Sequence, residues 1–149
     1  LPSPNASTET ISPEEPAAAL HQGGNAKKIT LLADLGESAA HRKPTTLFIQ
    51  KLLEACKLTL DDVALVNTHR DIPSLGLLRQ HLQPSVVLLF GLDPVQLGLP
   101  IRFPEFKLQA HDGITFLLLP SLHTFLSEEE SAKLLKSKLW VCLKSLFRL

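Results

Sequence analysis

The sequence predicts an α/β domain built as a three-layer α/β/α sandwich around a mostly parallel sheet of four strands. Two observations carry this prediction. Apolar runs such as residues 86–90 and 117–119 have no polar alternation, which suits strands that are buried on both faces. These runs alternate with stretches in which apolar residues recur at helical spacing, as expected of parallel strands joined by helices.

The composition is that of one domain with a hydrophobic core. Of 149 residues, 44% are hydrophobic, and the 15 Lys and Arg residues balance the 15 Asp and Glu residues. This balance excludes a strongly basic nucleic-acid-binding protein. The two cysteines, Cys56 and Cys142, lie in helix-like apolar patterns and are expected to be free and buried.

Cofactors and membranes are not expected. The six histidines show no metal-ligand spacing, and the sequence has no glycine-rich phosphate loop. No apolar run reaches the roughly 18 residues that a membrane span needs, and the first residues do not resemble a signal peptide. We therefore expect a cytoplasmic protein that has no cofactor and makes no contact with a membrane.

The N-terminal segment differs in composition from the rest. Residues 1–27 are rich in Pro, Ser, Glu, Ala and Gly and hold few large apolar side chains. Such a segment cannot bury enough surface to offset the entropy of ordering, so we predict a disordered tail, with residues 28–149 as the folded domain. The tail is either simple leader sequence or a motif that folds on a partner.

The first half of the domain reads as strand, helix, strand. Residues 29–33 form the first predicted strand, and residues 34–43 form a polar loop. Pro44 suits the first turn of a helix whose apolar positions continue to Cys56. A turn then leads to the second strand, residues 63–67.

The second half begins with a predicted helix over residues 72–81, which ends before Pro84. Residues 86–90 form the third strand, and residues 93–97 form a helical turn. Residues 107–110 and 114–119 flank His111-Asp112-Gly113, and the Asp-Gly pair favours a hairpin between them. Residues 114–119 are counted as the last strand of the sheet.

The last helix begins with a predicted capping box formed by Ser127 and Glu130. Basic residues dominate from residue 133 to the end, and this face either contacts phosphate or an acidic partner or is simply solvated. The apolar face is formed by Ala132, Leu135, Leu139, Leu143 and Leu146, widened by Trp140 and Phe147.

Two strand ends mark the candidate site, residues 91–94 and 120–123, because ligands of parallel sheets bind outside the carboxyl ends of the strands. Ser121 lacks the nucleophile elbow of a serine hydrolase. Asp34 and Glu37 follow the first strand, where they either activate water or remain solvated loop acids.

Residues 28–147 resemble the uracil-DNA glycosylase superfamily. The resemblance rests on Gly36-Glu37 in the first loop, on the stretch LTLDDVALVN, and on Leu119-Pro120-Ser121, which is similar to the superfamily's His-Pro-Ser loop. It implies a uracil-DNA glycosylase-like fold. The positions of the site would be Asp34, Gly36, Glu37, Gly91, Leu119, Pro120 and Ser121.

The chain departs from the superfamily where the chemistry lies. Leu119 stands where the catalytic His would be, and the first loop has no Pro-Gly or Pro-Tyr after Glu37. An aromatic residue that would stack on a flipped base is also missing from the first loop. These departures predict a protein that is not an enzyme and has no catalytic residues.

The same order of elements is similar to a non-catalytic family with this fold, the psi subunits of bacterial DNA polymerase III. The resemblance implies that residues 1–27 bind the clamp loader and that the domain binds a chi-like subunit, whereas direct contact with DNA stays open. Apolar loop residues would supply the binding surface or belong to the core: Leu97, Leu99, Ile101, Phe103, Phe106 and Phe125. The alternatives are a divergent uracil-DNA glycosylase, in which Asp34 or Glu37 activates water, and an α/β domain without a role in replication.

Overall fold

The computed structural model describes residues 22–36, 39–69, 71–99, 104–127 and 129–148. Its centre is a five-stranded mixed sheet with the order β2-β1-β3-β5-β4. Four strands run parallel, and β4 pairs antiparallel with β5. The strands are β1 (Ile29–Ala33), β2 (Val63–Asn67), β3 (Val86–Phe90), β4 (Leu108–His111) and β5 (Ile114–Leu119).

The α/β class is confirmed, but the prediction of a mostly parallel four-stranded sheet is wrong. The difference is β4, which the Asp112-Gly113 turn joins to β5. Both turn residues have positive φ, 54° and 82°, which matches the twist of a tight hairpin. The hairpin was predicted, but its first arm was not counted as a strand of the sheet. This arm, β4, alternates between exposed and half-buried residues and therefore forms no apolar run.

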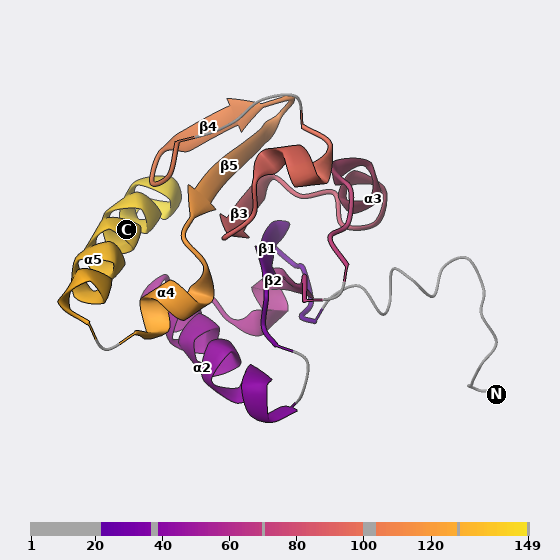
Figure 1. The fold of residues 1–149 in the computed structure, drawn as a ribbon. Helices are drawn as coiled ribbons and strands as arrows, with labels where there is room; N and C mark the ends of the chain where they lie inside the picture. The colour runs from indigo at the N-terminus through magenta and orange to yellow at the C-terminus, as the bar shows by residue number, and fades with distance from the viewer. Residues whose placement is uncertain (1–21, 37–38, 70, 100–103, 128, 149) are drawn as a thin grey trace.

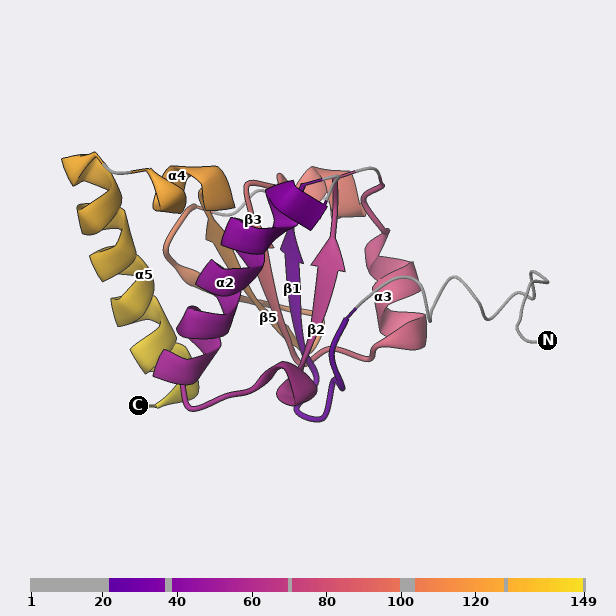
Figure 2. The ribbon, with the colours of Figure 1, turned by 90° about the horizontal axis from the view of Figure 1, so that it is seen from below.

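Helices lie on both faces of the sheet (Figures 1 and 2). One face packs against α2 (Ala39–Ala55), α4 (Leu122–Leu126) and α5 (Glu130–Phe147). The other face packs against α3 (Leu75–His81) and the 3-10 turn η2 (Pro94–Leu97), while a second 3-10 turn, η1 (Leu60–Asp62), precedes β2.

Each central strand contributes to two cores. In β3, Leu88 and Phe90 pack with α2 and α4, whereas Val87 and Leu89 pack on the α3 side. Both faces exclude water, so the strand shows no polar alternation. Each fully buried side chain of this kind stabilises the fold by about 1.5–3 kcal/mol relative to an exposed one.

Three predicted helix starts are wrong. The helix α2 begins at Ala39 rather than at Pro44, so Pro44 lies inside the helix, where its ring nitrogen cannot donate a backbone hydrogen bond. The helix α3 is shorter than residues 72–81, since the Ser74 hydroxyl caps it by accepting the Leu77 N–H at 3.1 Å. In α5 the cap is Glu129, and Ser127 accepts the Glu129 N–H at 3.2 Å instead of forming a capping box.

The folded domain also begins earlier than predicted. Residues 22–27, assigned to the tail by composition, run along the free edge of β2. Gln22 exchanges two backbone hydrogen bonds with Leu65, at 2.9 and 2.8 Å, and the Asn25 N–H donates to the Val63 carbonyl at 2.9 Å. We call residues 22–27 the N-terminal strap. The rest of the predicted tail, residues 1–21, lies outside the described residues.

Two glycines let the strap approach so closely. A Cβ on Gly23 would lie 2.4 Å from the Val63 carbonyl oxygen, and a Cβ on Gly24 would lie 2.5 Å from the Asp61 carbonyl oxygen. Neither position has room for a side chain. The strap therefore depends on backbone hydrogen bonds and on missing Cβ atoms, rather than on apolar burial.

Candidate functional site

The four parallel strands end at one edge of the sheet. Their last residues are Ala33, Asn67, Phe90 and Leu119. This edge carries the turns at which α/β proteins usually bind ligands. The predicted site residues that the structure describes all lie here, but they divide into two groups.

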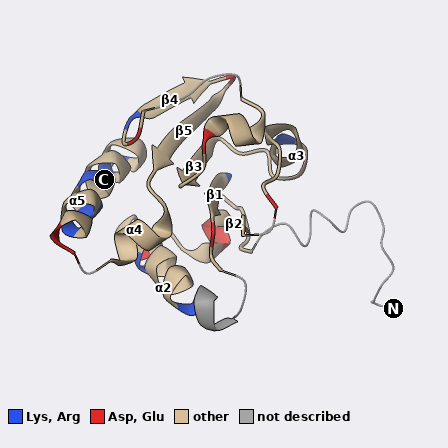
Figure 3. Ribbon diagram, viewed as in Figure 1, with Lys and Arg blue, Asp and Glu red and all other residues tan. Residues whose placement is uncertain are grey.

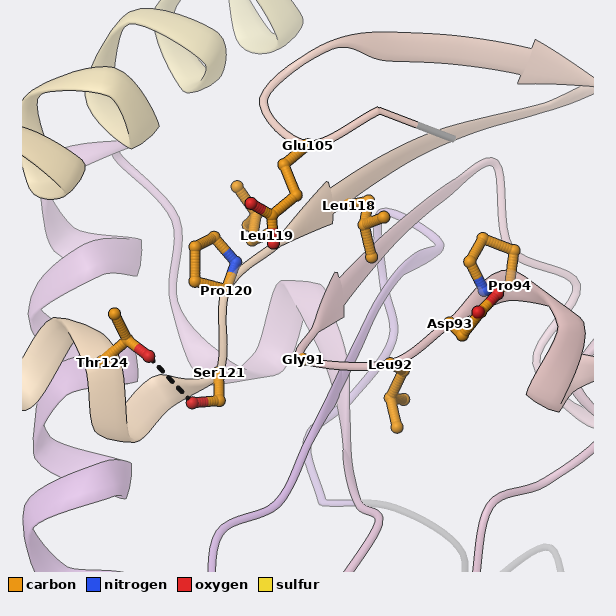
Figure 4. A pocket seen from close by; sticks show the side chains of 10 residues that line it. All are labelled: Gly91, Leu92, Asp93, Pro94, Glu105, Leu118, Leu119, Pro120, Ser121 and Thr124. Carbon is orange, nitrogen blue, oxygen red and sulfur yellow. Dashed lines mark hydrogen bonds between the residues drawn. The ribbon is translucent and has the colours of Figure 1, made fainter. Parts of the chain in front are cut away.

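The first group forms a pocket between the ends of β3 and β5 (Figure 4). Its volume is about 440 Å³, within the range of small-molecule sites. The predicted residues Gly91, Leu119, Pro120 and Ser121 are brought together in its wall. The other lining residues are Leu92, Asp93, Pro94, Glu105, Leu118 and Thr124.

Gly91, which follows β3, packs closely against Ser121, which follows β5, in the wall of this pocket. The Gly91 N–H donates to the Leu119 carbonyl at 2.8 Å, and Gly91 has a φ of +73°. A Cβ at this position would lie 2.9 Å from the Ser121 Cβ. Only glycine fits both the positive φ and the short distance to Ser121. The close packing of the ends of β3 and β5 therefore requires a glycine at position 91.

The polar groups of the pocket are hydroxyls and carboxylates. The Ser121 Oγ lies 3.1 Å from the Thr124 Oγ1, so the two hydroxyls share one hydrogen bond (Figure 4). The Asp93 carboxylate accepts the Val95 N–H at 3.0 Å, and Glu105 is exposed at the rim. No imidazole or ammonium group occurs among the described lining residues, and the side-chain partner of Ser121 there is Thr124.

Leu119 is fully buried, with 0% of its surface exposed, and its side chain belongs to the core between the sheet and α4. This is the position compared above with the catalytic His of the glycosylases. An aliphatic side chain in the core can neither donate a hydrogen bond to a base nor transfer a proton.

The second group lies at the ends of β1 and β2. The Asp34 Oδ1 lies 2.9 Å from the His69 Nδ1 and accepts the Gly36 N–H at 3.0 Å. Neither Asp34 nor Gly36 lines the pocket of the first group. Glu37, predicted with them, lies outside the described residues.

Asn67 organises this second group. Its Oδ1 accepts the N–H groups of Leu35 and His69, both at 3.0 Å, and its Nδ2 donates to the Gly36 carbonyl at 3.0 Å. The sequence analysis missed both Asn67 and His69. The sequence did contain a signal for Asn67, because it is a polar residue at the end of an otherwise apolar, buried strand. A side-chain amide at such a position can hydrogen-bond the backbone of the following loop.

Both cysteines are free, as expected, but only Cys56 is buried and Cys142 is half-buried. Burial raises the pKa of the Cys56 thiol to about 11, and it also raises the pKa of Cys142, whose Sγ donates to the Phe106 carbonyl at 3.2 Å. Thiols of this kind are weak nucleophiles. In the described part of the chain, no cluster of three or more His, Cys, Asp or Glu side chains is arranged to hold a metal ion.

Of the apolar loop residues predicted to form a binding surface, most of those that the structure describes lie in the core. Leu97, Leu99 and Phe125 are buried and Phe106 is half-buried, whereas Ile101 and Phe103 lie outside the described residues. Large apolar side chains are instead exposed on helices, in the turn η2 and on β4. These are Leu47, Val95, Leu108, Leu134, Trp140 and Val141.

None of the described helices is both long and apolar enough to cross a bilayer. Comparisons with protein-family models and with curated proteins found no match for this sequence.

Proposed function

We propose that this chain is a non-catalytic protein-interaction subunit with a uracil-DNA glycosylase-like fold, similar in role to the psi accessory subunit of the bacterial DNA polymerase III clamp-loader complex. It would act in the cytoplasm. Its partners would be proteins, a clamp-loader subunit for the N-terminal segment and a chi-like subunit for the folded domain.

The observation that carries this proposal is the complete burial of Leu119 beside the pocket. The pocket keeps the strand-end geometry of a binding crevice, including the Gly91 turn and the Pro120-Ser121 pair. At the position that would stabilise a departing base, however, it offers only an aliphatic side chain in the core. A scaffold of this kind supports binding rather than base excision.

The charge of the pocket supports protein partners over DNA at this edge. Asp93 and Glu105 place two carboxylates in its wall. A nucleic-acid site needs Lys or Arg to neutralise phosphates, and a carboxylate repels them. We therefore do not propose the pocket as the place of any DNA contact.

An uracil-release assay on single-stranded and duplex DNA tests the absence of catalysis. We expect no release of uracil by the purified chain. Release that disappears in the Asp34→Asn variant would contradict the proposal.

An affinity pull-down with purified clamp-loader and chi subunits tests the binding role. The full chain should retain a clamp-loader subunit, and a chain without residues 1–21 should lose it. The deletion stops at residue 21 because the N-terminal strap is hydrogen-bonded to β2. If neither kind of subunit is retained by the full chain, the proposed role fails.

The second candidate function is a divergent uracil-DNA glycosylase. One observation favours it, the 2.9 Å pairing of Asp34 with His69 at the end of the sheet, where both side chains remain accessible at 47% and 36%. A carboxylate that orients an imidazole is a usual arrangement for general-base activation of water. A His69→Ala variant with reduced uracil release would support this candidate.

A further inference from the structure

A groove between α2 and α5 lies away from the strand ends. It has a volume of about 270 Å³ and an apolar floor formed by Phe48, Leu52 and Leu139. This volume is below that of typical small-molecule sites, so the groove suits one or two side chains of a peptide better than a whole ligand. Trp140 forms part of its wall and is 37% exposed.

Two lysines flank this apolar floor, Lys51 from α2 and Lys136 from α5. Among the described residues, no carboxylate pairs with either ammonium group. By contrast, Lys133 on the same helix contacts Glu130 at 3.4 Å. The groove therefore combines apolar area with two uncompensated positive charges, one on each side.

The helix α5 as a whole carries an excess of positive charge. It contains four lysines and one glutamate, and Figure 3 shows the basic positions spread along its length. An excess of one sign attracts oppositely charged partners and speeds their association. A groove with an apolar floor and lysines on both sides is complementary to a segment in which a large apolar side chain has acidic neighbours.

We propose that the groove between α2 and α5 binds an acidic peptide segment of a partner protein, with one large apolar side chain inserted between Phe48, Leu52 and Trp140. This inference rests on the proposed role as an interaction subunit and names the surface and the chemistry of one partner. The Lys51 and Lys136 ammonium groups pair with carboxylates that flank the inserted side chain.

Trp140 is the only tryptophan of the chain, and the chain has no tyrosine, so its fluorescence reports on the groove directly. The probe is a labelled synthetic peptide with a central phenylalanine and two glutamates on each side. We expect a saturable change in Trp140 emission when the full chain is titrated with this peptide. The same peptide with lysines in place of glutamates should cause no change, and binding should weaken as KCl rises from about 50 to about 300 mM.

Anisotropy of the labelled peptide then tests the residues. We expect Lys51→Glu and Lys136→Glu each to weaken binding about fivefold, since each loses one attraction and adds one repulsion. Trp140→Ala should weaken binding about tenfold, as expected of an aromatic residue in an interface. Lys144→Glu and Val141→Ala are matched controls on α5 outside the groove, and they should change the affinity less than about twofold. Thermal unfolding of each variant shows whether the fold is intact.

Several results would overturn the proposal. These are absence of saturable binding, equal binding of the lysine peptide, or equal weakening by Lys144→Glu and Lys136→Glu.

Two further results would show that the groove has a different occupant. If Glu14→Lys combined with Glu15→Lys alters Trp140 emission without peptide and strengthens peptide binding, the groove holds the chain's own N-terminal segment. If emission depends on protein concentration and light scattering shows a dimer, the groove holds a second copy.

The proposed role as an interaction subunit and the proposed peptide-binding groove are refuted by different results. Uracil release by the chain would contradict a non-catalytic role without changing the affinity for the peptide. If the peptide does not bind while the full chain still retains the clamp-loader and chi subunits, the groove is refuted as a binding surface and the proposed role as an interaction subunit stands.

Discussion

Gly91 at the end of β3 lies against Ser121 at the start of α4, so closely that an added Cβ would come within 2.9 Å of the serine Cβ. The contact joins two segments that are far apart in the sequence at the edge of the sheet where the pocket forms. The shape of the pocket therefore depends on a glycine at position 91.

Gly91→Ala should therefore destabilise the domain by about 2–4 kcal/mol, because it adds a steric clash to the cost of a positive φ. Urea unfolding measures the change. Gly113→Ala is the matched control, since Gly113 also has a positive φ, +82°, but nothing within 4 Å of an added Cβ. It should cost about 1 kcal/mol. Equal losses for the two variants would contradict the role of the Ser121 contact.

Gly24→Ala should detach the N-terminal strap from β2. The added Cβ would lie 2.5 Å from the Asp61 carbonyl oxygen, which is backbone and cannot easily move. We expect faster hydrogen exchange at the Leu65 amide, whose partner is the Gln22 carbonyl. Gly76→Ala in α3 has open space, with the nearest atom 3.9 Å away, and should stabilise by about 0.5–1 kcal/mol. Unchanged exchange at Leu65 in Gly24→Ala would show that the strap tolerates a side chain.

Asn67→Ala should cost about 2–3 kcal/mol, because it removes the amide that holds two loop N–H groups and one carbonyl at the end of β1. His69→Ala should cost less than about 1 kcal/mol, since its side chain is partly exposed and its pair with Asp34 is screened. Chemical denaturation of the two variants gives the comparison. If His69→Ala lowers the free energy of unfolding more than Asn67→Ala does, the imidazole and not the Asn67 amide is the main stabilising group at the ends of β1 and β2.

Cys56 makes the stability of the domain depend on pH in the alkaline range. Burial raises its pKa in the folded state from 9.0 to about 11, so the unfolded chain loses this proton first. The contribution is fully present below pH 9 and is lost as the pH rises toward about 11. Unfolding measured across this range should show a steeper loss of stability in the wild type than in Cys56→Ala. Parallel curves would exclude the thiol as the cause.

The strand-end pocket could be predicted from the sequence because its signals are local. An apolar run that stops at Gly91, and another that stops at Pro120, each mark the end of a buried strand, and parallel strands bring such ends to one edge. Asn67 and His69 could not be found in this way. Their roles depend on the pairing of β1 with β2, which brings Ala33 beside Asn67, and on a loop conformation that no local pattern encodes.

The N-terminal strap was misassigned for a different physical reason. Composition estimates how much apolar surface a segment can bury, and residues 22–27 bury little. What holds them is a set of backbone hydrogen bonds to η1 and β2, made possible by the absence of side chains at Gly23 and Gly24. The start of α2 was misplaced similarly, because Pro44 is compatible with a helix that has already begun.

The strap has a consequence for the solubility of the protein. The outer edge of β2 would otherwise present the free backbone groups of Val63 and Leu65 beside a strand of apolar side chains, a template for pairing with strands of other molecules. Gln22 and Asn25 occupy those groups. Proteolytic loss of the strap would therefore expose an aggregation-prone edge, and fragments cut after Asn25 should precipitate more readily than fragments cut before Gln22.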